Sequence, residues 1–262
     1  MAIGIYDSGV GGLSIWRELQ VRLKTRLIYF GDTAHVPYGE KGADELEGYF
    51  WNIMNFFRSR GCVGAVVACN TTSTLVLPRV KDKVEYPVLG IVEGAVEATL
   101  AAGNGSVGIL ATKATVESGV YQRALSEARP DWQVYAQSAP RLVPLVEGGQ
   151  VEGKKAEEAV REYLEPLLAK GIDTLLLGCT HYPFLREQLE RAAGSGVRIV
   201  DPAPYIAQRA EAIWPQFSQG GEYLGSEFWV SAKPEAFRQT AQKLLGTEIK
   251  HVHFHEDVEE GK

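Results

Sequence analysis

Two cysteines, Cys69 and Cys179, stand in the same kind of local sequence. Each follows a short apolar run, at residues 66–68 and 175–177, and each precedes a polar turn. The sequence therefore predicts a thiol at the carboxyl end of each of two buried strands, with a helix starting soon after Cys69. Ligands bind at that place in open α/β sheets, and the partial positive charge of a helix N-terminus favours a thiolate. Two such thiols facing one cleft could move a proton from one face of a carbon to the other.

Other roles fit the two thiols less well. Cysteine is among the most often buried residue types, so either thiol alone could simply belong to the core. A C-x-x-C redox motif is absent, and a zinc site would need more ligands at tight spacing than His181 adds. A papain-like nucleophile would use one cysteine and would not explain the second. The pair is therefore better explained by joint chemistry.

The surroundings of the two cysteines form a repeat. Residues 3–8 and 107–112 share the pattern of an aliphatic residue, Gly, Ile, two further residues and Ser or Thr. Each half opens with such a strand and later presents one cysteine. We therefore expect an α/β protein of two pseudo-symmetric lobes with mostly parallel sheets and the active site in the cleft between them. The predicted lobes are residues 1–93 with 206–262, on the Cys69 side, and residues 94–205, on the Cys179 side.

Hydrophobic periodicity and turn residues place the elements that position these motifs. Strands are predicted at residues 2–6, 26–30, 65–68, 88–92, 132–136, 174–177, 198–200, 227–230 and 249–254. Helices are predicted at residues 13–23 and 43–60, from about 73, up to about 101, from 115 to about 128, and at 154–169, 185–193, 206–214 and 234–245. Residues 142–149 are expected to form an apolar loop that carries one acid, Glu147. The segment after residue 206 is expected to complete the sheet of the first lobe.

Composition limits the function classes. The net charge of −6 disfavours non-specific binding to nucleic acid or to an anionic membrane. No apolar stretch approaches the length of a transmembrane helix, and the N-terminus shows no export signal. Three cysteines do not make a disulfide framework in a chain of this length, so we expect a cytoplasmic protein. The third cysteine, Cys62, is expected to be a small core residue.

The glycine loop at residues 7–12 permits a dinucleotide site. It follows a strand and precedes a helix, and Asp32 stands where a ribose-binding acid would lie. Ser14 at the third glycine position and the carboxylate of Asp7 weaken this interpretation. It is a minor alternative to a close-packed strand-to-helix turn that needs glycine for its backbone.

Three alternating histidines near the C-terminus, His251, His253 and His255, would share one face of a strand. This arrangement permits a metal site. Nothing else connects them to the cysteines, so we favour solvated edge-strand histidines and expect no metal.

Five motifs together carry a family resemblance. They are residues 7–12 (DSGVGG), 31–34 (GDTA), 37–39 (PYG), 69–71 (CNT) and 178–183 (GCTHYP). In order and spacing they resemble the glutamate branch of the cofactor-independent aspartate/glutamate racemase family, along nearly the whole chain. The resemblance implies interconversion of L- and D-glutamate without a cofactor and a role in supplying D-glutamate for bacterial peptidoglycan. Some members of the family are dimers, so a homodimer is also expected.

The resemblance also implies roles for particular residues. Cys69 would take the proton from D-glutamate and Cys179 from L-glutamate, with Asp7 assisting Cys69, and Glu147 and His181 assisting Cys179. The residues expected to bind the substrate are Asp7, Ser8, Pro37, Tyr38, Gly39, Cys69, Asn70, Thr71, Thr112, Thr115, Cys179, Thr180 and His181. Hydroxyls and backbone amides at helix N-termini suit its carboxylates. Residues 31–39 form a polar loop, the substrate loop, that the resemblance places at the substrate. Two departures from the family pattern lie in or near it: His35 stands where arginine is common, and Gly42 where serine is common.

The sequence permits two alternatives to a glutamate racemase. An aspartate- or hydantoin-type racemase would share the two thiols and differ in substrate. A two-lobed amino-acid binding protein would close its cleft without catalysis. The second alternative gives no reason for two thiols and would commonly carry an export signal, so it is the weaker one.

Overall fold

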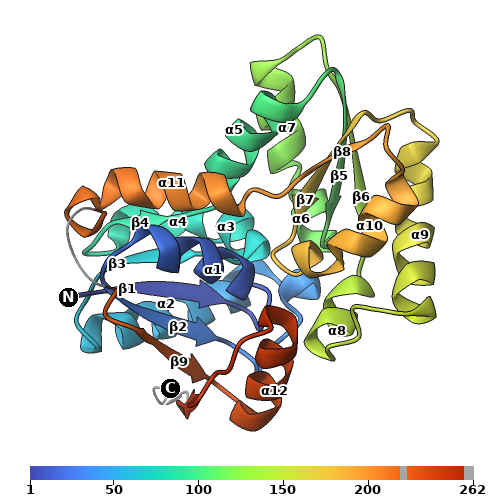
Figure 1. Cartoon of the computed structure of the whole chain (residues 1–262). Coiled ribbons are helices and arrows are strands. Elements are labelled where there is room, and N and C mark those ends of the chain that lie inside the picture. The colour runs from blue at the N-terminus through green and yellow to red at the C-terminus, as the bar shows by residue number, and fades with distance from the viewer. Residues whose placement is uncertain (219–222, 257–262) are drawn as a thin grey trace.

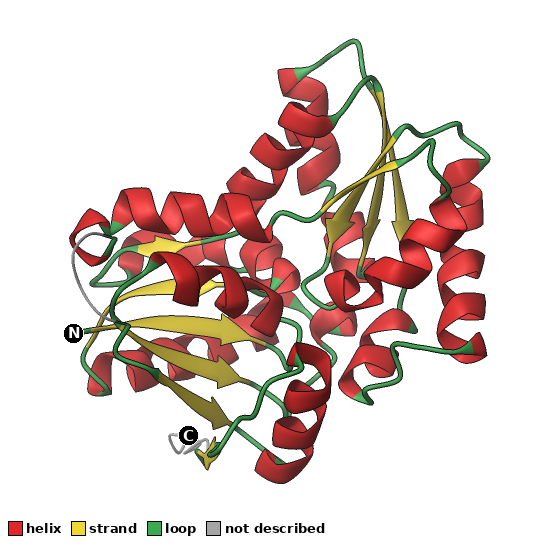
Figure 2. Ribbon diagram, in the orientation of Figure 1, coloured by secondary structure: helices red, strands yellow, loops and turns green. Residues whose placement is uncertain are grey.

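The computed structural model of the chain describes residues 1–218 and 223–256, which form two α/β lobes (Figure 1). Each lobe contains one sheet of parallel strands, with helices on both of its faces (Figure 2). This arrangement confirms the predicted fold class. Residues 219–222 and 257–262, which fall in the predicted first lobe, lie outside the described residues.

Four neighbouring strands of the first sheet have the same order as the four strands of the second, which reflects the sequence repeat. The first contains β1 (Ala2–Asp7), β2 (Arg26–Gly31), β3 (Cys62–Val67), β4 (Val88–Leu89), β9 (Ser226–Val230) and β10 (His253–Phe254). The second contains β5 (Ser106–Ala111), β6 (Gln133–Ser138), β7 (Thr174–Gly178) and β8 (Arg198–Val200). The orders are β10-β9-β2-β1-β3-β4 and β6-β5-β7-β8. In both, the strand that opens the repeat, β1 or β5, pairs with the strand that leads to a cysteine, β3 or β7.

The chain returns to the first lobe after the second sheet. Helix α11 (Ala203–Ile213) packs between α1 (Leu13–Arg22) and α5 (Val92–Ala102), as Figure 1 shows. Strand β9 then pairs with β2, and β10 pairs with β9. The C-terminal segment thus completes the first sheet, as the sequence predicts.

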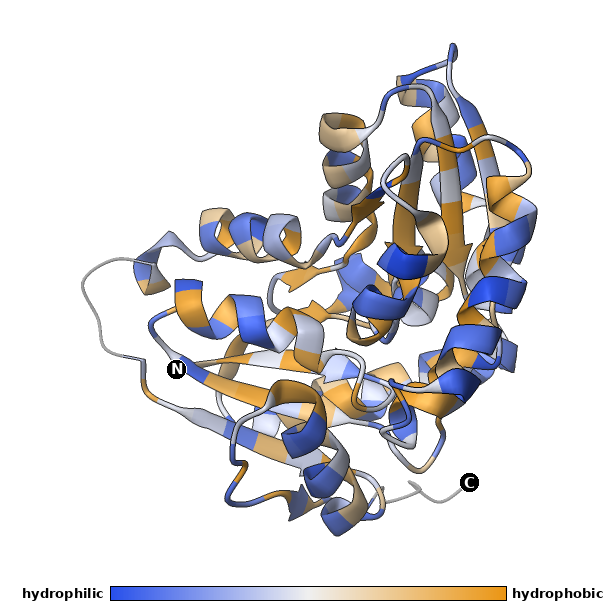
Figure 3. Cartoon of the chain, turned by 45° about the vertical axis from the view of Figure 1, so that its right-hand side comes forward, coloured by the Kyte–Doolittle hydropathy of each residue, from blue (hydrophilic) through white to orange (hydrophobic). Residues whose placement is uncertain are grey.

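The other helices cover the sheets. They are α2 (Ala43–Ser59), α3 (Asn70–Leu75), α4 (Leu77–Val80), α6 (Lys113–Ser118), α7 (Val120–Ala128), α8 (Leu142–Glu147), α9 (Lys154–Leu168), α10 (Arg186–Ala193) and α12 (Pro234–Leu245). Hydrophobic colour runs along the strands, while the helices alternate between hydrophobic and hydrophilic residues (Figure 3). This is the pattern of parallel strands buried on both faces and of helices with one face in solvent. No helix within the described residues is long and apolar enough to cross a membrane.

The expected apolar loop at residues 142–149 was wrong. Its first six residues form helix α8, which ends at Glu147. Pro144 favours a loop when it is read alone, but it occupies the first turn of this helix. The N–H groups of a first turn have no partner within the helix, so proline is tolerated there.

Other element boundaries also differ from the predictions. Helix α3 starts at Asn70 and not near Ser73, because Cys69 is itself its N-cap. The helix predicted up to Ala128 is two helices that meet at Gly119, which has a left-handed backbone (φ 64°). The strands predicted at 88–92 and 249–254 shorten to the two-residue strands β4 and β10, which lie at opposite edges of the first sheet.

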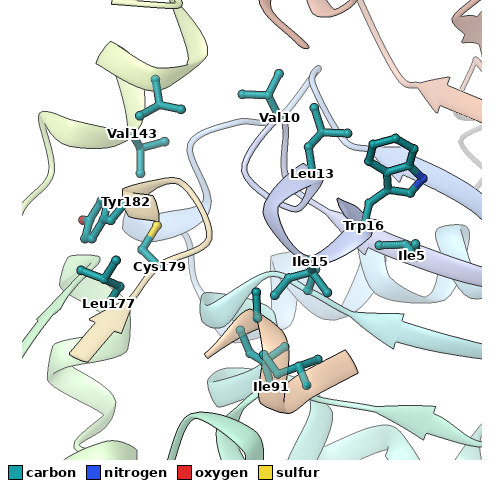
Figure 4. Packing of buried hydrophobic residues seen from close by; sticks show 14 of the residues in the cluster. Ile5, Val10, Leu13, Ile15, Trp16, Ile91, Val143, Leu177, Cys179 and Tyr182 are labelled. Atoms are coloured by element: carbon teal, nitrogen blue, oxygen red, sulfur yellow. The ribbon is translucent and has the colours of Figure 1, made fainter. Parts of the chain in front are cut away.

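The carboxyl ends of both sheets meet between the lobes. The arrowheads of the two sheets in Figure 2 point toward the same region. One hydrophobic cluster joins the lobes there: Val10 and Leu13 belong to the first lobe, and Val143, Cys179 and Tyr182 to the second (Figure 4). Polar residues that follow the strands of both lobes therefore lie close together between the lobes.

Candidate active site

A cavity between the lobes contains both thiols. It holds about 490 Å³ of empty space, part of it open to solvent. Cys69 and Cys179 both line it, and each side chain is almost completely buried. Its lining residues are Ser8, Pro37, Tyr38, Gly39, Glu40, Cys69, Asn70, Thr71, Thr112, Lys113, Pro140, Val143, Cys179, Thr180 and His181.

Most residues predicted to bind a substrate lie in this wall, and two lie just behind it. The carboxyl group of Asp7 is fully buried and accepts a hydrogen bond from Oγ1 of Thr180 (3.1 Å). Thr115 accepts a hydrogen bond from Oγ1 of Thr112 (3.0 Å), and its backbone N–H is capped by the same hydroxyl. Both residues therefore orient a wall residue from behind.

Cys69 is held in its protonated form. Burial, followed by the negative charge of Asp7, raises the pKa of its thiol to about 12. The backbone N–H and the hydroxyl of Thr72, in the first turn of α3, lower the pKa by a smaller amount. The helix N-terminus thus lowers the pKa as the sequence suggests, but loss of solvent outweighs it in this cavity.

Cys179 stands at the end of a chain of polar contacts. Its Sγ lies 3.7 Å from Nδ1 of His181, and Nε2 of His181 lies 2.6 Å from Oε1 of Glu147. Burial lowers the pKa of His181, but its hydrogen bonds with Cys179 and Glu147 raise it more, so the pKa lies well above the ordinary value. The raised pKa favours the imidazolium form of His181, and an imidazolium beside a sulfur stabilises negative charge on it.

The carboxyl group of Asp7, in the first lobe, is hydrogen-bonded to residues of both lobes. Its oxygens accept hydrogen bonds from the backbone N–H of Gly9 (3.1 Å) and from the hydroxyl of Thr180. Burial raises its pKa, while His181 and the backbone N–H groups of Gly9 and Gly12 lower it. Asp7 is thus an ionisable group whose state affects Cys69 and responds to His181.

The glycine loop after β1 serves this charge network. The backbone N–H of Gly9 donates to Asp7, and that of Val10 donates to Oε1 of Glu147 (2.9 Å). A Cβ on Gly11 would lie 2.5 Å from Oγ1 of Thr180 and would collide with the ring of His181. Glycine is therefore needed for close approach between the lobes. These amide donors face carboxylates of the protein, which argues against the dinucleotide alternative.

Gly11→Ala is expected to lower turnover roughly tenfold, because the added methyl group forces His181 away from Cys179. The matched control is Gly42→Ala. Gly42 is the N-cap of α2 near the substrate loop, and nothing lies within 4 Å of a Cβ built there. Initial rates of both variants would be measured with circular dichroism as a check on folding. Equal rates for Gly11→Ala and the parent would show that the close approach has no kinetic role.

Hydrogen bonds between the lobes close the cavity at Asn70 and Thr71. Oγ1 of Thr71 lies 3.0 Å from Oγ1 of Thr112, which precedes α6 in the other lobe. The amide of Asn70 and the hydroxyl of Tyr121 are hydrogen-bonded at 2.6 Å. The residues directly after Cys69 therefore connect it to the second lobe.

A buried carboxylate supports the substrate loop. Asp32 accepts hydrogen bonds from the hydroxyls of Tyr38 and Ser231, the latter at 2.6 Å. Its Oδ1 lies 2.8 Å from Nδ1 of His35, whose ring stacks on Tyr49 with centroids 4.0 Å apart. Asp32 is thus surrounded by protein groups, which further argues against a ribose-binding role. His35 thus places a ring nitrogen beside this carboxylate.

Two of the three C-terminal histidines, His253 and His255, pack against aromatic rings. His253 lies on the edge strand β10 and is exposed, and its ring stacks on Trp229 at 4.4 Å. His255 is half-buried and packs on Phe56 at 4.7 Å, so the prediction that all three are solvated was wrong for it. Within residues 1–218 and 223–256, no group of three or more His, Cys, Asp or Glu could hold a metal ion.

Four lining residues were missed from the sequence: Glu40, Lys113, Pro140 and Val143. Pro140 and Val143 belong to the segment around α8, which was expected to be a loop. Glu40 and Lys113 directly follow Gly39 and Thr112, which were identified. Their position next to predicted site residues could have identified Glu40 and Lys113 as lining residues. Their charge alone could not, because most charged side chains are simply solvated.

Comparisons with known proteins show which family this chain resembles. The family model Asp/Glu/Hydantoin racemase matches residues 15–210. A glutamate racemase of Desulforudis audaxviator is 48% identical over 257 residues, which cover 94% of this chain and 94% of that protein. The crystal structure of Francisella tularensis glutamate racemase with D-glutamate has a TM-score of 0.88 at 28% identity and covers 97% of each chain. That of Thermus thermophilus glutamate racemase with beta-chloro-D-alanine has a TM-score of 0.84 at 38% identity, and covers 97% of this chain and 96% of that one.

Proposed function

The chain belongs to the Asp/Glu/hydantoin racemase family, and on that basis we propose that it interconverts L- and D-glutamate by proton transfer between two thiols. The observation that carries the proposal is that Cys69 and Cys179, one from each lobe, line the same cavity. Glutamate racemases are the relatives similar to it along nearly the full length. An enzyme of this type is an isomerase that needs no cofactor, since the thiols supply both base and acid.

The reaction requires opposite protonation states of the two thiols. The Cα–H of an amino acid is a very weak acid, so its removal needs a close base, little water and donors for the developing charge. Burial raises the pKa of the Cys69 thiol, which suits Cys69 to hold a proton, and His181 lies 3.7 Å from Sγ of Cys179, where an imidazolium can stabilise a thiolate. We propose that the enzyme meets L-glutamate with a Cys69 thiol and a Cys179 thiolate. This state is suited to L-glutamate: Cys179 removes the Cα proton, the electron pair stays on the substrate, and Cys69 delivers its proton to the opposite face. The product state has a Cys69 thiolate and a Cys179 thiol, which is the state that accepts D-glutamate.

The polar wall supplies donors for the substrate carboxylates. Ser8, Thr71, Thr112 and Thr180 line the cavity, together with residues 37–39. The hydroxyls of Thr112 and Thr180 donate to Thr115 and Asp7 in this structure, so they would have to turn from these partners to a substrate carboxylate. Thr112 caps α6, and the N-terminus of a helix favours an anion. These neutral donors can hold carboxylates without transferring protons themselves.

The test is a time course of circular dichroism on L-glutamate with the bare protein. The expected result is decay of the signal to zero without added pyridoxal phosphate or metal. Activity that appears only with a cofactor would overturn the proposal. Faster turnover of aspartate would favour the aspartate-type alternative, and calorimetric binding of glutamate without loss of chirality would favour the binding protein.

The wider biological setting is part of the same proposal. We propose that the product D-glutamate supplies peptidoglycan synthesis and that the protein acts in the cytoplasm, where thiols stay reduced. Its three cysteines are all free, which suits that compartment. We also propose that residues 1–93 with 206–262 move as one lobe and 94–205 as the other, and that the protein forms a homodimer. Sedimentation analysis would test the last point.

Asp7→Asn is expected to lower kcat roughly tenfold to a hundredfold while changing KM little. The substitution removes the charge that contributes to the raised pKa of Cys69, but it keeps an oxygen that can accept from Thr180. Steady-state kinetics with both enantiomers would measure the separate effects on kcat and KM. A rise in KM with unchanged kcat would instead make Asp7 a plain binding group.

A further inference from the structure

The cavity contains one unexplained positive charge. Among the described residues that line it, Lys113 is the only lysine or arginine. The other cation, His181, already contacts Glu147 and Cys179. A dicarboxylate substrate brings two negative charges into this cavity, so a cation at its edge has a specific use.

Lys113 and Glu40 lie on opposite sides of a constriction. Gly39 of the first lobe packs directly on Thr112 of the second, and a Cβ on Gly39 would lie 2.8 Å from Cβ of Thr112. Glu40 and Lys113 are the next residues on the two sides. Both are exposed, so the contact between the lobes stands at the boundary between cavity and solvent.

A second depression lies immediately outside this constriction. It holds about 480 Å³ of empty space and is lined by Gly39, Glu40, Lys41, Lys113, Ala114 and Glu117. Gly39, Glu40 and Lys113 line both spaces. The depression is therefore the vestibule of the substrate cavity, and these three residues form the passage between them.

The two charges at the passage are weakly engaged by their surroundings. Nζ of Lys113 lies 3.8 Å from Oε1 of Glu117, and both side chains are more than half exposed, so this pair contributes little. Glu40 has no ion pair with any of the described residues. Lys41, in contrast, pairs with Glu45 at 2.5 Å. Lys113 can therefore exchange its partner for a substrate carboxylate at small cost.

We propose that Lys113 and Glu40 form an electrostatic gate at the mouth of the active site, in which Lys113 binds a carboxylate of the incoming substrate and Glu40 opposes it. The proposal rests on the proposed function, since it assumes a dicarboxylate substrate. The two charges face the same passage from opposite lobes, so their effects on the affinity for an anion have opposite signs. Neither residue takes part in proton transfer.

The test compares the neutral variants Lys113→Gln and Glu40→Gln. Lys113→Gln is expected to raise KM roughly three- to tenfold, and Glu40→Gln to lower KM by a similar factor. In both, kcat stays within about twofold of the parent, because the thiols are untouched. The changes apply equally to both enantiomers, and raising the ionic strength reduces them.

Two controls separate this gate from a structural effect. Lys113→Arg keeps the charge and should restore the parental KM. Lys41→Gln removes the same charge from the vestibule, at a residue that pairs with Glu45 and does not line the cavity, and should change KM by less than about twofold.

Three outcomes would overturn the gate. They are an unchanged KM in Lys113→Gln, a raised KM in Glu40→Gln, and equal effects of Lys41→Gln and Lys113→Gln. Failure of the proposed function is distinguishable, because the parent protein would then not racemise glutamate. In that case, calorimetric titration of the same variants with glutamate would still measure the two opposite charge effects on binding.

Discussion

Conversion of either Cys69 or Cys179 to alanine is expected to abolish racemisation in both directions. Each turnover needs one thiolate to remove a proton and one thiol to deliver one, and each lobe supplies a single thiol to the cavity. A side chain from one lobe cannot reach the opposite face of Cα. The loss should therefore be roughly 10⁴-fold or more for each variant, since both general base and general acid catalysis stop. Optical assays started from L- and from D-glutamate would measure it.

The third cysteine provides a matched control. Cys62 is buried in β3, and its thiol does not line the cavity. Cys62→Ala should keep turnover within about twofold and lower the free energy of unfolding by about 1 kcal/mol, the cost of a small cavity in the core. Full activity in either Cys69→Ala or Cys179→Ala would end the two-thiol mechanism, whatever the control shows.

Isotope exchange distinguishes two bases from one. In deuterium oxide, the proton removed by one thiol stays on that sulfur while the other thiol delivers deuterium from solvent. Early product should therefore carry deuterium at Cα, and recovered substrate almost none. A single base working on both faces would return deuterium to substrate and product alike, which contradicts the mechanism proposed here.

The sequence repeat predicted the fold well because it consists of short patterns that can be recognised within a few residues. The patterns around β1 and β5, and before Cys69 and Cys179, are short runs in which apolar periodicity and strand ends agree. Strands that alternate with helices along the chain favour parallel sheets, and the carboxyl ends of such strands lie at one edge. The positions of Cys69 and Cys179 at the ends of such strands predicted in the same way that both thiols lie at that edge.

Features that depend on distant contacts were not predictable in this way. Residues 142–147 form helix α8, which packs on Tyr182–Leu185 and on α9, two segments that are distant from it in sequence. The environment of Asp32 includes Ser231, which lies on a returning segment of the chain. The pKa of Cys69 depends on burial within the whole fold, and this outweighs the helix N-terminus that the sequence does reveal.

His181→Asn is expected to lower kcat roughly 10²- to 10⁴-fold, because it removes the cation beside Cys179. The two enantiomers have equal free energies, so kcat/KM must fall by the same factor for L- and D-glutamate. An asymmetry can appear only in the separate values of kcat and KM. The expected asymmetry is a larger loss of kcat from L-glutamate, whose proton is taken on the Cys179 side. Progress curves from both enantiomers would measure it, and equal kcat losses would contradict the assignment of His181 to that side.

Glu147→Gln tests the same assignment through pH. The hydrogen bond with Glu147 is one of the two that raise the pKa of His181, so its removal should bring that pKa down. The imidazolium is present below its pKa and is lost as pH rises through it. The alkaline limb of the kcat profile should therefore move to lower pH in Glu147→Gln, while the exposed Glu152→Gln leaves it in place. An alkaline limb that stays fixed in Glu147→Gln would show that His181 does not set it. Since Val10 donates to the same carboxylate oxygen from the first lobe, a shifted limb would also connect the ionisation of this pair to the contact between the lobes.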